Sequence, residues 1–143
     1  MGNYHYIIAG LPELVLNADN KSFSYDAVRE SIYYSSDEKD RRLIEWFDFG
    51  TSEENLTSHF YRAAFRNKCR FIRHWFALDL EIRNRKVDFV AGKMGRDASQ
   101  YKVATECNVD LGLTEEQLQK LSGIFANKNI LEKEQLLDKF KWD

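Results

Sequence analysis

The chain has 143 residues, of which 43% are apolar, 31% charged and 14% aromatic, with one proline and seven glycines. This length fits one domain, and the aromatic content excludes a chain that is disordered throughout, because so much surface can be buried. Two cysteines exclude a disulfide framework, and no apolar run reaches the roughly 18 residues that a membrane-spanning helix needs.

The net charge of −2 hides an uneven distribution. Residues 1–54 carry five Lys or Arg and eleven Asp or Glu, residues 55–96 carry ten and three, and residues 97–143 carry six and nine. The middle of the chain is therefore basic. Its charge either meets an acidic or nucleic-acid partner or is neutralised by the acidic flanks of the same molecule, and both interpretations stay open.

The N-terminal third predicts two short helices. The first dozen residues form an apolar lead-in that is too short for its periodicity to separate a strand from one helical turn. Ser22 or Ser24 can then cap a helix that ends near Tyr34. Ser36 precedes an amphipathic run with acidic residues in its first turn, and Gly50 can stop that run.

The middle of the chain predicts one long helix. The segment Leu56–Arg96 has no proline and no glycine before Gly92, so it can form one helix over about 56–95 that spans roughly 55 Å. Thr51 or Ser52 supplies its start signal. Its apolar residues at helical spacing predict contact with other helices on both sides of its middle section. The main stripe comprises Phe60, Ala64, Phe71, Trp75, Leu78, Ile82 and Phe89.

The C-terminal third predicts two more helices. The glycines of the GKMG stretch end the long helix, and a polar connection with a break at Gly112 follows. Thr114 and Gln117 form a capping box, and Asn129 precedes a last amphipathic piece. The missing cap at its end indicates that more chain follows in the natural protein, and no internal repeat is found. Residues 1–143 are expected to form a single all-α domain, an elongated helical bundle built around the long helix.

No residue pattern for catalysis, a cofactor or a metal is found. The histidines His5, His59 and His74 are scattered, without the spacing of metal ligands. Cys69 lies among apolar residues, which is typical of packing rather than reactivity. The quartet Gly92–Gly95 matches the G-x-x-G of a KH loop, although helix termination explains it better. We therefore expect no catalytic, cofactor-binding or metal-binding residue, and no enzyme.

Four arginines at helical spacing form a basic row on one side of the predicted long helix, namely Arg62, Arg66, Arg70 and Arg73. Such a row can meet phosphates. The aromatic residues between them lie on the opposite, apolar side, where packing leaves none for stacking on bases. The pattern therefore favours docking to an acidic protein surface over binding to nucleic acid.

The stretch Leu80-Glu81-Ile82-Arg83-Asn84, within FIRHWFALDLEIRNRKVDFVAGKMG, and the opening NYHYIIAGLPEL resemble a family of bacterial proteins of uncharacterised function. That family is similar to the component of V/A-type rotary ATPases that is called C or d. The resemblance implies an all-helical, non-catalytic central-stalk subunit without cofactors, which seats the rotor axle on the membrane ring. It also implies other ATPase subunits as partners. The implied location is cytoplasmic, peripheral to the inner membrane through those partners.

Arg83 and Asn84 are the candidate functional residues within the resembling stretch. They place polar groups in a largely apolar helix, so they need partners if they are buried. Partners in neighbouring helices of the same fold are favoured over direct contact with the axle. The alternative function is a basic helical module that binds RNA or DNA, for which strongly salt-dependent oligonucleotide binding would be the sign.

Overall fold

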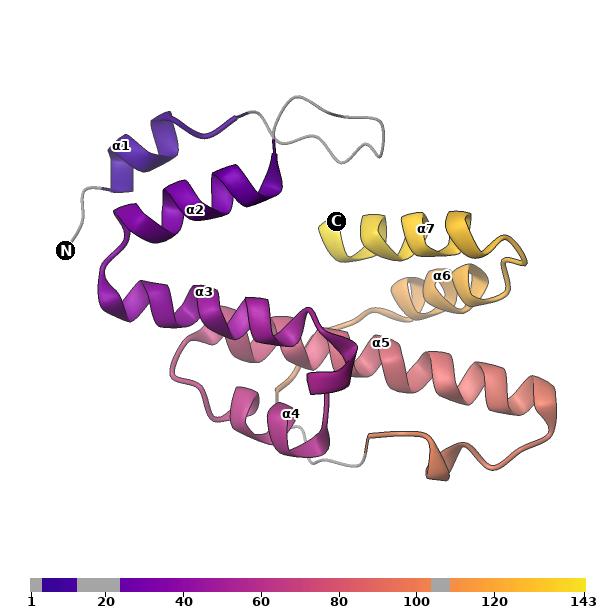
Figure 1. Ribbon diagram of the computed structural model, residues 1–143. Coiled ribbons are helices and arrows are strands. Elements are labelled where there is room, and N and C mark those ends of the chain that lie inside the picture. Colours follow the sequence, from indigo (N-terminus) through magenta and orange to yellow (C-terminus); the bar gives the residue numbers. More distant parts are fainter. Residues whose placement is uncertain (1–3, 13–23, 104–108) are drawn as a thin grey trace. The chain divides into compact units, whose positions relative to one another are not determined.

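The computed structural model describes residues 4–12, 24–103 and 109–143 (Figure 1). Every regular element in these ranges is helical, so the prediction of an all-α protein is confirmed. The chain divides into two compact units, Met1–Ser52 and Glu53–Asp143. The single domain over 1–143 stays a prediction.

The N-terminal unit contains, within its described residues, α1 (Tyr4–Ala9), α2 (Tyr25–Ser35) and α3 (Glu38–Gly50). The apolar lead-in is thus a short helix. Ser24 caps α2 as predicted, while Ser22 lies outside the described residues. Asp37, rather than Ser36, caps α3, because its carboxylate accepts from the backbone N–H of Asp40 at 3.0 Å.

Polar contacts join α2 to α3. Arg29 of α2 forms an ion pair with Asp48 of α3. Arg41 of α3 donates from its Nε to the carbonyl oxygen of Tyr33 at 2.8 Å, which satisfies an acceptor at the end of α2. None of the described apolar side chains of this unit is buried. Ion pairing and hydrogen bonding thus contribute to joining these two helices.

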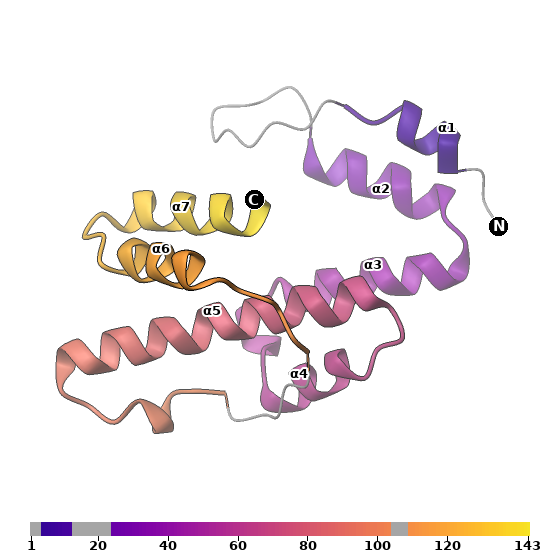
Figure 2. The same cartoon turned by 180° about the vertical axis from the view of Figure 1, so that it is seen from behind.

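The C-terminal unit is built on one helix, α5. Its elements are the 3-10 helix η1 (Glu53–Asn55), α4 (Ser58–Phe65), α5 (Arg70–Met94), the 3-10 helix η2 (Ala98–Gln100), α6 (Glu115–Phe125) and α7 (Ile130–Trp142). The 25 residues of α5 span about 37 Å. Figures 1 and 2 show α6 and α7 on one side of α5, and α4 with the returning segment 95–103 on the other.

The prediction of one helix over about 56–95 is wrong. The structure has two helices there, α4 and α5, separated by residues 66–69. Thr57 caps α4 by accepting from the N–H of Phe60 at 3.2 Å, so the proposed start signals at Thr51 and Ser52 are not used. The two helices fold back on each other (Figure 1).

The turn at residues 66–69 depends on an asparagine. The Oδ1 atom of Asn67 accepts from the backbone N–H of Cys69 at 2.8 Å. Such a side-chain bond offers the backbone an alternative to helical hydrogen bonding. Arg73 then donates from Nη1 to the carbonyl oxygens of Asn67 and Lys68, at 2.7 and 3.0 Å. The turn therefore leaves these carbonyls satisfied without glycine or proline.

The same turn joins α6 to α7, a repeat that the sequence analysis missed. The pattern Phe-x-Asn-Lys occurs at residues 65–68 and again at 125–128. Asn127 accepts from the backbone N–H of Asn129 at 2.9 Å, as Asn67 does two residues before α5. In both turns the N–H of the asparagine donates to a helix carbonyl at 3.1 Å. The unit therefore contains two helical hairpins with one turn design.

Capping at the other helix ends follows the predictions. Thr114 and Gln117 form the expected capping box at the start of α6. Asn129 caps α7 by accepting from the N–H of Glu132 at 3.1 Å. Gly95 ends α5 with φ of 65°, the left-handed conformation that glycine adopts without strain. The stop at the GKMG stretch is thus confirmed for Gly95, whereas Gly92 lies inside the helix.

A hydrophobic cluster fixes α6 and α7 on α5. Its buried members are Ile82 of α5, Leu121, Ile124 and Phe125 of α6, and Leu137 of α7. Together with the contact of Phe76 with Phe60 of α4 on the other side, the cluster confirms that α5 meets helices on more than one side. Not every residue of the predicted stripe is buried, because Phe71 is 61% exposed and stacks on Trp75 with 6.1 Å between ring centroids.

The substitution Leu121→Ala tests this cluster. We expect it to lower the free energy of unfolding by about 2 to 5 kcal/mol, because it removes a fully buried side chain and leaves a cavity. The measurement is urea unfolding followed by circular dichroism. The matched control is Leu131→Ala, whose side chain is 68% exposed and should change stability by no more than ~0.5 kcal/mol. Equal effects of the two substitutions would contradict the packing of α6.

Candidate functional site

The predicted row of four arginines does not lie on one helix. Arg62 belongs to α4, Arg66 follows its end, Arg70 begins α5, and Arg73 lies within its first turn. They therefore gather around the α4–α5 turn. Arg73 is partly buried and closes that turn through the carbonyls described above, so it serves the fold.

The other three arginines are exposed, as is Lys68 beside them. Within the described ranges, none of the four forms a salt bridge with a carboxylate. The part of the chain that the structure describes thus leaves a positive surface, the basic turn, comprising Arg62, Arg66, Lys68 and Arg70. Such a surface can attract an acidic protein or a phosphate backbone.

A buried carboxylate lies at the junction of α4, α5 and α7. Asp79 of α5 is 8% exposed. Its Oδ2 atom accepts from the hydroxyl of Tyr61 at 2.7 Å and from Nε of Arg83 at 2.9 Å. Its Oδ1 atom is 3.5 Å from Nζ of Lys141. The partners of this negative charge therefore come from three helices, namely α4, α7 and α5 itself.

Tyr61 is the neutral partner of this junction. Its side chain is fully buried, and its pKa is raised above the ordinary value, first by burial and then by the hydrogen bond to Asp79. The phenol therefore stays protonated and donates to the carboxylate throughout the neutral range. The junction carries the negative charge of Asp79 and the positive charges of Arg83 and Lys141, and we call it the charge cluster.

Both candidate residues of the resembling stretch find partners within the unit. Arg83 pairs with Asp79, four residues earlier on the same helix, a spacing that brings the two side chains together. Asn84 clamps the backbone of Val103: its Nδ2 donates to the carbonyl oxygen at 3.2 Å, and its Oδ1 accepts from the N–H at 3.1 Å. Asn84 thereby fixes the segment that follows η2 against the middle of α5. The favoured interpretation, that these residues serve the fold, agrees with this placement.

Sequence reasoning missed Tyr61, Asp79 and Lys141 as one cluster. The visible signal was an aspartate between two leucines, in the run Leu78-Asp79-Leu80, where an apolar helix face continues on both sides. A carboxylate in that position has to be paired if the helix is covered. The tyrosine and the lysine could not be assigned to it, because they come from helices that only the fold brings near.

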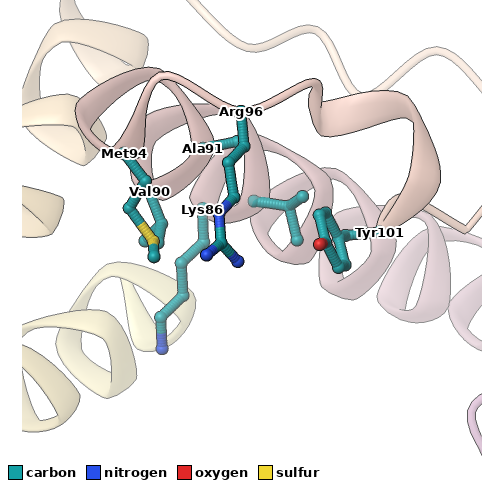
Figure 3. Close-up of a pocket in the computed structure, with 7 residues that line it drawn as sticks. Lys86, Val90, Ala91, Met94, Arg96 and Tyr101 are labelled. Atoms are coloured by element: carbon teal, nitrogen blue, oxygen red, sulfur yellow. The ribbon is translucent and has the colours of Figure 1, made fainter.

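A hollow of about 320 Å³ opens on the C-terminal half of α5 (Figure 3). Its apolar wall is formed by Val87, Val90, Ala91, Met94 and Tyr101, and Lys86 and Arg96 line it as well. We call it the α5 groove. Its wall is apolar but partly open, since Val90 and Met94 are exposed. The sequence analysis did not predict it.

Metal ligands do not gather in the described ranges. There, no group of three or more His, Cys, Asp or Glu side chains converges as metal ligands would. Likewise, none of the helices in these ranges combines the length and the apolar character that crossing a membrane requires. Cys69 has a free thiol next to the α4–α5 turn, and Cys107 lies outside the described residues.

Comparison with known proteins places the chain in a family. A family model described as "Protein of unknown function (DUF2764)" matches residues 48–143. The chain belongs to this family. The matched region includes the whole C-terminal unit, and with it the charge cluster, the basic turn and the α5 groove. No curated protein and no solved structure matches the chain.

The substitution Tyr61→Phe tests the charge cluster. At about pH 8 we expect it to lower the free energy of unfolding by about 1.5 to 3 kcal/mol, because a buried bond to a charged group is lost. The raised pKa of Tyr61 means that the folded chain holds the phenol proton more tightly than the unfolded chain. The contribution of Tyr61 is therefore complete below the unfolded pKa of about 10 and declines as the pH rises above it.

Chemical unfolding of wild type and Tyr61→Phe at several pH values measures this. The stability difference should be constant up to about pH 9 and shrink above about pH 10. Tyr101→Phe is the matched control, since Tyr101 is 56% exposed and its substitution should change little at any pH. A difference between wild type and Tyr61→Phe that stays constant to high pH would speak against the bond to Asp79.

Proposed function

We propose that this chain is a non-catalytic subunit of the central stalk of a V/A-type rotary ATPase, where it links the rotor axle to the membrane ring. The observation that carries the proposal is the stretch Leu80–Asn84, by which the sequence resembles the C (or d) component of these ATPases. That stretch lies in the middle of α5. In this proposal the chain is cytoplasmic and reaches the inner membrane only through its partner subunits.

The packing around α5 supports a coupling role. A subunit that transmits torque must resist bending, and close packing on several sides gives a helix that stiffness. Tyr61 of α4 and Lys141 of α7 both contact Asp79, which lies near the middle of α5. Asn84 holds the returning segment on a further side through Val103. The helix that carries the resembling stretch is therefore in contact with α4, α6 and α7 and with the returning segment.

In this proposal Arg83 and Asn84 stabilise the fold around α5 and do not contact the rotor axle. Both side chains are engaged within the unit, so the contacts with partner subunits fall to other surfaces. The basic turn is one such surface. It carries exposed cations that the described carboxylates do not neutralise, which suits an acidic face on another subunit.

Affinity capture tests the proposed function. The tagged full-length chain, expressed in its native cells, should recover the other subunits of a rotary ATPase, and the purified chain alone should not hydrolyse ATP. A matched bait in which Arg62, Arg66 and Arg70 are changed to Glu should recover less of these subunits, because opposite charges at the basic turn would then become like charges. Recovery of unrelated proteins only would count against the proposal.

A second candidate function is nucleic-acid binding, which the basic turn favours. Three exposed arginines and a lysine in one place are the electrostatic footprint of a phosphate-binding surface. The aromatic residues of α4 do not assist, since Phe60, Tyr61 and Phe65 are all buried and cannot stack on bases. The aromatic residues of α4 therefore add no base stacking to the charge of the basic turn.

Oligonucleotide binding separates the two functions. The stalk proposal expects only weak binding to a random single strand, with a Kd no tighter than about 1 μM at physiological salt. If the three arginines alone contact phosphates, the logarithm of the affinity should fall with the logarithm of the salt concentration with a slope of about −2. Fluorescence anisotropy at several salt concentrations measures both quantities. Tight binding that survives in the Arg-to-Glu variant or at high salt would contradict this account of the basic turn.

A further inference from the structure

The α5 groove continues a helix face that α4 covers only in part. Phe76 lies on this face and contacts Phe60 of α4 edge-on, with ring centroids 5.0 Å apart. Steps of three and four residues lead from there along the same face to Val87, Val90 and Met94. α4 has only eight residues and covers the N-terminal half of α5.

Beyond α4 the face is open. Val90 is 42% exposed and Met94 is 57% exposed, although residues at this spacing are normally covered by another helix. The groove thus lies beside the returning segment, on the part of this face that the segment leaves exposed.

Fixed neighbours border this open face on two sides. On one side Lys86 extends toward α7, where its Nζ lies 3.4 Å from a carboxylate oxygen of Glu134. On the other side the returning segment carries Tyr101, and Lys102 pairs with Asp88 of α5 at 2.7 Å. These contacts, with the clamp at Asn84, hold the borders in place, so the groove exists before any partner binds.

The end of α5 places a positive charge in the groove. The N–H of Arg96 donates to the carbonyl oxygen of Ala91 at 2.9 Å, and the N–H of Gly95 donates to that of Gly92, which is the Schellman pattern of helix termination. This turn returns Arg96 over Ala91, and Figure 3 shows its guanidinium on the same open side as the amine of Lys86. Among the described residues, no carboxylate forms a salt bridge with Arg96.

We infer that the α5 groove binds an amphipathic helix of another protein, whose apolar side packs on Val87, Val90 and Met94 while an Asp or Glu beside that stripe pairs with Arg96. Helices recognised in grooves present apolar anchors at this spacing. The unneutralised guanidinium selects an acidic residue at the edge of the contact. A small amphiphile suits the site less well, because the exposed wall cannot enclose most of its surface. The inference does not rest on the proposed ATPase role.

A synthetic peptide tests the groove. The probe is a fluorescein-labelled helix of about 14 residues, or four turns, with Leu along one stripe and Glu beside it. We expect it to bind the full-length chain saturably in fluorescence anisotropy. Val90→Glu combined with Met94→Glu should abolish binding. Arg96→Glu should weaken it about tenfold and strengthen binding of a matched peptide with Lys in place of Glu, because the charges are then complementary again.

Lys120→Glu is the matched control, since it makes the same change of charge at an exposed position on α6, away from the groove. It should leave binding within about twofold of the wild type. Thermal unfolding of each variant confirms that it is folded, which is expected because the substituted side chains are exposed.

Three results would overturn the inference. The first is absence of saturable binding of the acidic peptide, or equal binding by wild type and Val90→Glu/Met94→Glu. The second is a wild-type dimer in sedimentation that this double variant converts to monomer, since the occupant would then be a second copy of the chain. The third is binding of dodecanoate, abolished by the double variant, without binding of the peptide. Failure of the ATPase capture experiment would leave the peptide result unaffected, so the two proposals are separable.

Discussion

The C-terminal unit depends on one buried carboxylate. Asp79 can stay charged away from water only while it is paired and hydrogen-bonded, because an isolated buried charge is very costly. Its three partners, Tyr61, Arg83 and Lys141, come from α4, α5 and α7. These helices must therefore meet in one arrangement. Apolar packing around Leu121 holds α6 and α7 on α5, whereas the carboxylate relates α4 and α7 to one position along α5.

This arrangement divides α5 into a closed half and an open half. Toward its N-terminus α4 covers the face that carries Phe76, and α6 and α7 cover the side that carries Ile82. Toward its C-terminus the face is bordered by the returning segment and by the contact of Lys86 with α7, and the groove remains between them. A rigid part joined to a prepared, unfilled surface is the form expected of a subunit that connects other proteins. The stalk proposal and the groove inference both draw on it, through different residues.

Sequence reasoning predicted what depends on near neighbours and missed what depends on the fold. Caps of α2, α6 and α7 were found, because a cap needs only a few adjacent residues. The break at 66–69 was missed because it contains neither glycine nor proline, yet its pattern recurs at 125–128, where a helix start was recognised. Asp79 lies one turn before Arg83, a spacing that favours their ion pair on one helix. The contacts of Asp79 with Tyr61 and Lys141 were not predicted, because these residues lie far from it in the sequence.

The separation of these partners along the chain also bears on how the unit assembles. Asp79 and Tyr61 belong to one hairpin with a short turn, and contacts between segments close in sequence form early because little loop entropy is lost. Lys141 belongs to the last helix of the unit. The first hairpin by itself supplies the carboxylate with a tyrosine and an arginine, and the second hairpin adds the lysine. The full set of partners for Asp79 therefore exists only where both hairpins are in place.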